Sequence, residues 1–532
     1  MIRGRSLLLL LGTARALGSG RVRALALALG LATLGSTAAQ AGEVGRHRLG
    51  AGGTVKVVRA IDLDGDGRKD LVLLLEGQQG RSSEVLLLRT PASPDAATYF
   101  PGAAQQRIAC DGELAEAGAL AVGRFGPAGE VRLRFLGPRG IREVAADGAR
   151  LPARAGLDTP TLLVRSPGRA LAFWDGVADL DGDGKDELWL PAADAAGGML
   201  VVHGGSTGSE AVRCSRLAVR VGHAAGTSLE QVVQRTTYVP TLVAADLDGD
   251  RRKELVELRE RVLRAYDVLA PVVEGAREAV RSIPLRFLDP PPDLPPEEVR
   301  SPRLNLADAD GDGTTDLLVT LVTGRRDKVG GMRTTLWYVP GPIAGADGVL
   351  RQPEGRIDTE SVALHPTFVD LDGDGGLDYV CDAIRGTAAD LVRNVMGKDP
   401  TITFVGFRLD RQARRYVPEP FFTVARTYPA QQALSNKFGT SAFLAGDLDG
   451  DGLKDLLDLG TLSGVEVLRG ERRPAGEPGE PLRYASPLLA RMALPRAVAP
   501  AALLEDLDGD GRSEAVLWGE DEVFLLAPRG PR

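Results

Sequence analysis

The nine residues DLDGDGRKD, at positions 62–70, decide the fold, because the chain contains almost the same sequence seven times. The other copies are DLDGDGKDE (179–187), DLDGDRRKE (246–254), DADGDGTTD (308–316), DLDGDGGLD (370–378), DLDGDGLKD (447–455) and DLDGDGRSE (506–514). Each copy has acids at its positions 1, 3, 5 and 9. Carboxylates so close together repel one another unless a cation lies between them. Oxygen ligands without Cys or His favour calcium, so each copy is predicted to be a calcium-binding loop.

The predicted ligands are the four acids of each loop and the backbone carbonyl of position 7, where the side chain varies freely. These residues are Asp62, Asp64, Asp66, Arg68, Asp70, Asp179, Asp181, Asp183, Lys185, Glu187, Asp246, Asp248, Asp250, Arg252, Glu254, Asp308, Asp310, Asp312, Thr314, Asp316, Asp370, Asp372, Asp374, Gly376, Asp378, Asp447, Asp449, Asp451, Leu453, Asp455, Asp506, Asp508, Asp510, Arg512 and Glu514. Position 4 is glycine in all seven loops, which predicts a tight turn with a positive φ there. We expect about seven calcium ions, all with a structural role.

The loops differ from those of an EF-hand, which needs a glutamate at position 12 and a helix on each side. Position 12 here is Leu, Val or Cys in five of the seven loops. A short apolar run of strand length follows each loop, for example LVLLL at 71–75. The loops are therefore predicted to be turns of β-hairpins, in which the metal holds the fold together.

The spacing of the loops predicts a repeat architecture. Successive loops begin 117, 67, 62, 62, 77 and 59 residues apart, and a unit of about 60 residues fits one four-stranded propeller blade. The first interval is nearly double, and residues 121–136 (AVGRFGPAGEVRLRFL) have the turn and the following strand without the acids. Arg124, Gly126, Ala128 and Arg132 stand there at the ligand positions. The predicted fold class is all-β, a β-propeller of about eight four-stranded blades, seven of them with calcium loops.

The loops resemble the FG-GAP and VCBS-type repeats of integrin-α-like β-propellers. The closest stretch is KFGTSAFLAGDLDGDGLKDLLDLG, residues 437–460, in which Phe438 and Gly439 precede the loop. The other units keep the loop without the Phe-Gly pair, and the Gly-Ala-Pro tripeptide of the family is missing. The resemblance covers residues 45–528 and implies a fold and a metal rather than a partner.

The N-terminal 41 residues have the pattern of a secretory signal peptide. Five arginines and no acids precede the apolar run 24–34, and Ala39-Gln40-Ala41 is a small-residue cleavage site. The apolar runs of this N-terminal segment, including 24–34, are too short to span a bilayer, and no later segment is predicted to be transmembrane. We expect a secreted, periplasmic or cell-surface protein with a signal peptide at 1–41 and the propeller at 42–532.

Two parts of the chain depart from the regular repeat. The 77-residue interval contains TAADLVRNVMG, residues 387–397, which predicts a short helix within an inserted helix and loop region near 385–436. This region is the best candidate for a binding surface. At the C-terminus, residues 501–505, 514–518 and 522–528 make three strand-length runs, one short of a blade. Residues 45–50 are predicted to supply the missing outer strand and so to close the ring.

Composition and motifs argue against several functions. The net charge of −8 is mostly a property of the predicted ligands, and no basic stripe with aromatics predicts nucleic-acid binding. None of the four histidines forms a metal-ligand pair. Residues 204–208 (GGSTG) match a nucleophile elbow, but strand-like runs on both sides favour a hairpin turn. A pairing of Cys110 with Cys214 stays open.

We therefore expect a non-catalytic binding, adhesion or envelope scaffold protein, whose ligand is a protein or a polysaccharide. The alternative is a polysaccharide-active protein, either a lyase or a lectin, because some lyases look like calcium-bearing eight-bladed propellers. A lyase would need His, Tyr, Lys or Arg side chains that converge at one end of the central channel.

Overall fold

The computed structural model describes residues 44–528 with internal gaps. The gaps are 78–81, 93–99, 101–104, 152–160, 164–169, 192–197, 205–208, 214–217, 225–231, 239, 260, 274–275, 291–292, 294, 296–297, 326–331, 345–348, 360–361, 364–365, 385–400, 428–443, 462–463, 475, 494–500 and 520. The predicted signal peptide, the predicted helix at 387–397 and Cys214 lie outside the described residues. In the described part, no helix is long and apolar enough to cross a membrane.

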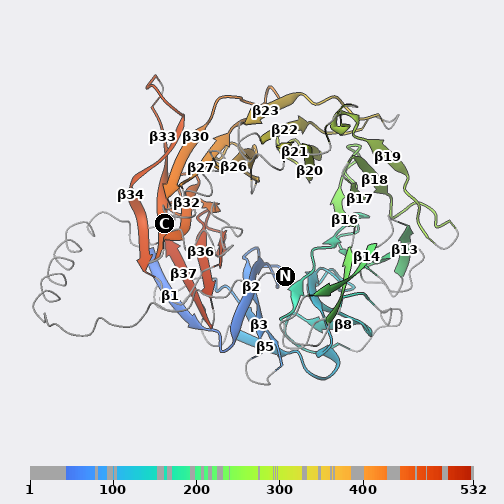
Figure 1. Cartoon of the computed structure of the whole chain (residues 1–532). Coiled ribbons are helices and arrows are strands. Elements are labelled where there is room, and N and C mark those ends of the chain that lie inside the picture. The colour runs from blue at the N-terminus through green and yellow to red at the C-terminus, as the bar shows by residue number, and fades with distance from the viewer. Residues whose placement is uncertain are drawn as a thin grey trace, which may run out of the picture.

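The protein is an eight-bladed β-propeller, so the predicted fold class is confirmed. The described strands form eight blade sheets arranged in a ring (Figure 1). β2 (Thr54–Ile61), β16 (Thr241–Ala245) and β20 (Glu298–Ala307) lie near the centre of the ring in this view. β5 (Gln105–Ala109), β19 (Arg281–Pro284) and β23 (Gly355–Thr359) lie at its outside.

We number the blades in chain order. Blade 1 consists of β2, β3 (Asp70–Glu76), β4 (Glu84–Leu88) and β5. Blade 2 consists of β6 (Ala119–Gly123), β7 (Arg132–Gly137), β8 (Gly140–Ala145) and β9 (Ala172–Phe173). Blade 3 consists of β10 (Val177–Ala178), β11 (Glu187–Pro191), β12 (Gly198–Val202) and β13 (Ser209–Arg213). Blade 4 consists of β16, β17 (Glu254–Arg259), β18 (Val262–Tyr266) and β19. Blade 5 consists of β20, β21 (Asp316–Arg325), β22 (Arg333–Val339) and β23.

The last three blades follow the same plan. Blade 6 has β24 (Val362–Ala363), β25 (Thr367–Val369), β26 (Asp378–Ile384), β27 (Thr401–Phe407) and β30 (Phe422–Thr427). Blade 7 has β31 (Leu444–Gly446), β32 (Asp455–Thr461), β33 (Gly464–Arg472) and β34 (Leu482–Ala493); blade 8 has β35 (Ala501–Glu505), β36 (Glu514–Gly519), β37 (Glu522–Pro528) and β1 (Val44–Gly50). Blade 6 counts five strands because β24 and β25 both pair with β26 and together act as one interrupted first strand.

A few elements lie outside the blades. β14 (Ala218–Ala224) pairs with β15 (Val232–Tyr238), and β28 (Leu409–Asp410) pairs with β29 (Arg415–Tyr416). The 3-10 helices η2 (Gly112–Leu114) and η3 (Arg286–Leu288) are one turn each. β27 and β30 belong to blade 6 and lie within the region near 385–436, with the β28–β29 hairpin between them.

The unit without acids forms blade 2, as its sequence predicted. β6 and β7 pair antiparallel across the turn that contains Arg124 and Gly126. The fourth strand, β9, pairs parallel with β6, so this blade takes its remaining strand from the next part of the chain. The ring therefore holds eight blades although the acid loop occurs seven times.

The apolar cores lie between blades rather than at one centre. Along β3, Leu71, Leu73 and Leu75 pack against blade 8, and Val72 and Leu74 pack against blade 2. Successive residues of a strand point to opposite faces of the sheet, so a continuous apolar run can fill two interfaces at once. Every one of the eight blade-to-blade interfaces has such a cluster of buried residues.

The N-terminal strand lies at the outer edge of blade 8. β1 pairs antiparallel with β37 along its whole length, from Val44 opposite Pro528 to Gly50 opposite Glu522. The Ala51 amide donates to the Asp521 carbonyl at 2.7 Å, and Leu49 packs on the cluster between blades 1 and 8. In Figure 1, β1 (blue) lies beside β37 (red).

We predict that β1 stabilises blade 8. Removal of residues 42–50 would leave the backbone donors and acceptors of one edge of β37 without their partners, and such an edge promotes association. The melting temperature should fall by several degrees and oligomers should form, measured by thermal unfolding and size-exclusion chromatography. Removal of residues 42–43 alone is the control, because these residues precede the strand. A shortened protein that melts and elutes like the control would show that β1 is dispensable.

Candidate metal centres

Each acid loop is the turn between the first and second strands of its blade. In blade 1, β2 ends at Ile61 and β3 begins at Asp70, which is the ninth residue of the loop. The same boundaries recur in all seven blades that carry a loop. We name each loop by its first acid. The hairpin turns that the sequence predicted are therefore present.

The acids at positions 1 and 5 shape the turn by accepting backbone hydrogen bonds. The Oδ2 atom of position 1 accepts the amide of position 6 at 2.8–3.1 Å in all seven loops. The Oδ1 atom of position 5 accepts the amide of position 7 at 2.8–3.0 Å in all seven. The position 4 glycines have φ from +69° to +81°, as predicted, which a residue with a Cβ rarely adopts.

The acid at position 9 joins the loop to the rest of the blade. One of its oxygens accepts the amide of position 2 at 2.7–3.2 Å in all seven loops. In five loops the other oxygen accepts an amide from just after the third strand or, in blade 7, from within it, as Asp378 does from Leu409 at 3.0 Å. One carboxylate therefore holds both the turn and the neighbouring hairpin.

These ninth-position acids are buried, which makes the charged form costly. Burial raises the pKa of Asp378 and of Glu514 to about 8, that of Asp455 to about 7 and that of Asp316 to about 6. The other acids of the same loop add like-charge repulsion. A divalent cation beside these carboxylates would favour their ionised form.

The structure brings the predicted ligands of a loop close together. Carboxylate oxygens of Asp62, Asp64 and Asp66 lie within 4.8 Å of one another, and the same holds for positions 1, 3 and 5 of the Asp179 and Asp246 loops. In the Asp308 loop the group consists of Asp308, Asp310 and Asp316. Several acidic oxygens around a glycine turn are the donor set of a hard divalent ion. The residues present therefore fit a metal site.

The loops also bond to the loops of neighbouring blades. In three described junctions the amide of position 8 donates to the carbonyl of position 2 in the preceding blade; two of these are Lys454 to Leu371 at 2.9 Å and Leu377 to Ala309 at 2.7 Å. Lys69 bonds to Leu507 in the same way at 2.8 Å, which joins blade 1 to blade 8. A cation held in one loop would therefore act at a junction between blades.

Arginines that the sequence reasoning missed enter several of these loops. In three blades the residue opposite the ninth-position acid is an arginine, either directly after the third strand or within it: Arg89, Arg408 and Arg469. Arg469 contacts Asp449 at 2.7 Å and Asp451 at 3.0 Å, and Arg408 contacts Asp374 at 2.7 Å. These arginines follow the ninth-position acid by 19, 30 and 14 residues, so no constant spacing reveals them in the sequence.

In two further loops the contacting arginine does not lie opposite the ninth-position acid but comes from another part of the chain. Arg414, which precedes β29, contacts Asp310 and Asp312 at 2.8 Å each, and Arg281 of β19 forms an ion pair with Asp248. Guanidinium groups thus lie against the position 3 acid in five loops. They contact carboxylates that are also predicted metal ligands.

The β28–β29 hairpin spans two loops and borders an open cavity. The Nε atom of Arg411 donates to the Asp310 carbonyl at 2.6 Å, and its guanidinium also donates to the Asp374 carbonyl. The cavity has a volume of about 690 Å³. It is lined by Asp310, Asp312, Asp374, Arg408, Asp410, Arg411, Gln412 and Arg414. Five of these eight lining residues belong to the region near 385–436, which the sequence analysis identified as a candidate binding surface.

Residues 204–208 match the sequence of a nucleophile elbow, and the strands around them test that alternative. The strands that flank residues 204–208 pair antiparallel, with Val202 of β12 opposite Ser209 of β13, as the hairpin interpretation requires. A nucleophile elbow needs a strand followed by a helix.

Comparisons with known proteins identify no family. No family model matches the chain, and no curated protein matches it. Among solved structures, the V. cholerae biofilm matrix protein Bap1 is similar with 11% identity and a TM-score of 0.37, over 92% of this chain and 89% of that one. The Dos1 propeller is similar with 8% identity and a TM-score of 0.32, over 91% and 95%. At these values neither likeness assigns a function, and the fold rests on the sheet topology.

The buried acids predict how stability depends on pH when no metal is bound. Their pKa is about 4 in the unfolded chain and about 6 to 8 in the folded one, so the folded protein binds more protons between these values. Stability in chelator should therefore fall as the pH rises from about 4 to about 8. Calcium should reduce this fall by stabilising the ionised acids. Equal slopes of melting temperature against pH in chelator and in calcium would contradict the assignment.

The arginines predict a measurable competition with calcium. In the unaltered protein, calcium would have to displace the Arg469 guanidinium from Asp449 and Asp451. Replacing Arg469 by Gln removes this competing cation. We expect calcium affinity in that loop to rise about two- to tenfold, since partly exposed ion pairs contribute about 0.2–1 kcal/mol each. Equilibrium dialysis near the dissociation constant should show more calcium bound per chain of the variant than of the unaltered protein. Without metal, the variant should have the lower melting temperature of the two.

Arg483→Gln is the matched control, because Arg483 pairs with Glu471 outside the loops. If Arg469→Gln binds no more calcium than Arg483→Gln, then the guanidinium and the metal do not share those oxygens.

Proposed function

We propose that this chain is a secreted or periplasmic β-propeller that is stabilised by calcium and acts as a non-catalytic binding, adhesion or envelope scaffold. The observation that carries the proposal is the placement of the acid loops. Each loop is the first turn of its blade, and its position 8 amide bonds to the neighbouring blade in five described junctions. Bound ions would therefore strengthen the contacts that hold the ring together.

The acids of these loops support a structural rather than a reactive role. Positions 1, 5 and 9 already accept backbone amides, so their carboxylates set the conformation of the chain. Calcium would supply the positive charge that allows the acids at positions 1, 3, 5 and 9 to be ionised together, with the position 7 carbonyl as a further ligand. Nothing in this arrangement needs a bond to be made or broken.

The proposed location agrees with the proposed metal. The N-terminal signal pattern directs the chain out of the cytoplasm, where calcium is more abundant. Calcium sites in extracellular modules have dissociation constants of roughly 10⁻⁴ to 10⁻³ M. At millimolar calcium each such site stabilises the folded state by about 1 kcal/mol. Several sites together would provide a substantial part of the stability of a typical domain.

A polysaccharide ligand is the second candidate, and the cavity at the β28–β29 hairpin favours it. Its lining combines Arg408, Arg411 and Arg414 with Gln412 and four aspartates. Guanidinium groups bind carboxylates in pairs of hydrogen bonds, and amides and carboxylates bind hydroxyls. A sugar chain that carries carboxylates offers both groups.

We predict that chelation destabilises the protein strongly. Removal of calcium should lower the melting temperature by many degrees, and calcium, but not an equal concentration of magnesium, should restore it. Asp451→Asn should reduce the effect of chelation, whereas Glu471→Gln, outside the loops, should leave it unchanged. Calorimetry of the mature chain gives the measurement. A melting temperature that is the same with and without chelator would refute the metal assignment.

The binding role is tested on the same mature chain. Capture of a component from the envelope fraction of the secreting organism in calcium, and its release by chelator, would support a scaffold. Calcium-dependent binding of a purified polyuronate, lost in Arg411→Ala and kept in Arg483→Ala, would favour the polysaccharide ligand. Cleavage of the polyuronate would show a lyase and overturn the non-catalytic assignment.

A further inference from the structure

The Asp179 loop of blade 3 differs from the others at the position opposite its ninth acid. Leu188 of β11 pairs with Val202 of β12, so Glu187 is opposite His203. The equivalent residues in blades 1, 6 and 7 are Arg89, Arg408 and Arg469. A histidine thus stands where three other blades place a permanent cation.

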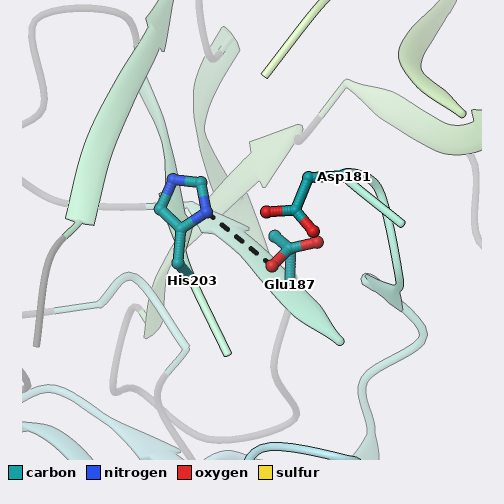
Figure 2. Close-up of side chains that lie close together, drawn as sticks. All are labelled: Asp181, Glu187 and His203. Carbon is teal, nitrogen blue, oxygen red and sulfur yellow. Dashed lines mark ion pairs between the residues drawn. The ribbon is translucent and has the colours of Figure 1, made fainter. Parts of the chain in front are cut away.

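The side chains of Asp181, Glu187 and His203 lie close together. Each offers one potential ligand atom, and these atoms all lie within 4.8 Å of one another. The Nδ1 atom of His203 is 3.7 Å from the Oε1 atom of Glu187 (Figure 2). Ligands of a tetrahedral ion with bonds of about 2.0–2.2 Å lie roughly 3.3–3.6 Å apart, so small side-chain rotations would suffice to complete the site.

The backbone holds two of these three groups in place. The Oε2 atom of Glu187 accepts the Leu180 amide at 2.8 Å, and Oδ1 of Asp181 accepts the Asp183 amide at 3.0 Å. Glu187 is 1% exposed, so its orientation is fixed by packing as well. Hydrogen bonds of this kind behind metal ligands orient them and increase metal affinity.

The remaining acids of this loop contact other cations. Lys185 contacts Asp183 at 2.7 Å, and Arg124 of blade 2 lies 3.8 Å from Asp179 and 3.1 Å from Asp186. Positions 1 and 5 of this loop are therefore partly neutralised. Positions 3 and 9 face the imidazole instead of a guanidinium.

We propose that Asp181, Glu187 and His203 form a site for a transition-metal ion of the zinc type, distinct from the oxygen-only loops. An imidazole nitrogen is a poor ligand for calcium and a good one for Zn²⁺, Co²⁺, Ni²⁺ or Cu²⁺. Two carboxylates and one imidazole make three protein ligands, and a water molecule completes four-coordination, as at open zinc sites. The inference deepens the proposed function, since it gives one of the seven loops a different metal.

The test uses Co²⁺ as a spectroscopic probe for the same site. The mature protein in excess calcium, which fills the oxygen-only loops, is titrated with Co²⁺ and followed by its visible absorption. One equivalent should give the strong bands of a four-coordinate ion, and one equivalent of Zn²⁺ should remove them. Isothermal titration with Zn²⁺ gives the affinity independently.

Variants at the histidine separate the inference from its alternatives. His203→Gln and His203→Arg should weaken Zn²⁺ binding by more than about tenfold, a loss that even residues behind a ligand can cause. His47→Gln, in β1 at the edge of blade 8, is the matched control and should keep the site. Arg469→His places an imidazole opposite Asp455 in blade 7 and should create a second Co²⁺ site.

The inference is overturned if His203→Gln binds Zn²⁺ as the unaltered protein does, or if Co²⁺ gives only the weak bands of a six-coordinate oxygen site. In either case His203 is a neighbour of Glu187 and not a metal ligand. Such a result leaves the calcium proposal standing, because that proposal depends on melting in calcium and in chelator. Conversely, a protein whose melting ignores chelator but which binds Co²⁺ through His203 would retain this site alone.

Discussion

The ring depends on the carboxylate at the ninth position of each acid loop. It begins the second strand of its blade, and its two oxygens accept amides from the loop and, in five blades, from within or just after the third strand. Two segments that would otherwise end in unpaired backbone donors are thereby fixed against each other. An unpaired buried donor costs about 1–3 kcal/mol, so a carboxylate that pairs two such donors makes a large contribution to the stability of its blade.

The same carboxylate makes a cation beside these loops favourable. An acid that accepts two amides inside a blade is held away from water, and burial raises its pKa. The neighbouring acids at positions 3 and 5 add further negative charge. Two kinds of cation can relieve this, either a bound divalent metal or a side chain such as Arg469. Arginine guanidinium groups lie at five loops and the imidazole of His203 lies at a sixth, so the loops are not equivalent copies of one site.

A propeller without a central core is sensitive to what happens at its junctions. Each apolar cluster lies between two adjacent blades, so each blade is stabilised chiefly by its two neighbours. The amide of position 8 crosses the same junctions, for example from Ser513 to Asp447 at 2.6 Å. A cation held at a loop would therefore act at a junction between two blades. Blade 2 lacks the acids and is joined to blade 3 by Arg124, whose backbone amide and carbonyl both bond to Asp186.

The sequence by itself determined the features whose physics is local. Nine residues contain the turn, its glycines and its acids, so the hairpins, the positive φ of position 4 and the strand that starts at Asp70 and its equivalents could all be predicted. The period of about 60 residues and the apolar runs were enough to predict eight blades, including the one at Ala121 that has lost its acids.

Only the tertiary structure decided what lies opposite each loop. Arg89, Arg408 and Arg469 share one position in the blade, but hairpins of different length separate them from their acids, so their alignment depends on strand register. His203 occupies the same position, and Arg414 reaches its loop from a hairpin of the next blade. The parallel strand β9 and the interrupted first strand of blade 6 likewise depend on distant pairing. Turn chemistry is encoded within a few residues, whereas the cation that a loop receives is set by the packing of separate segments.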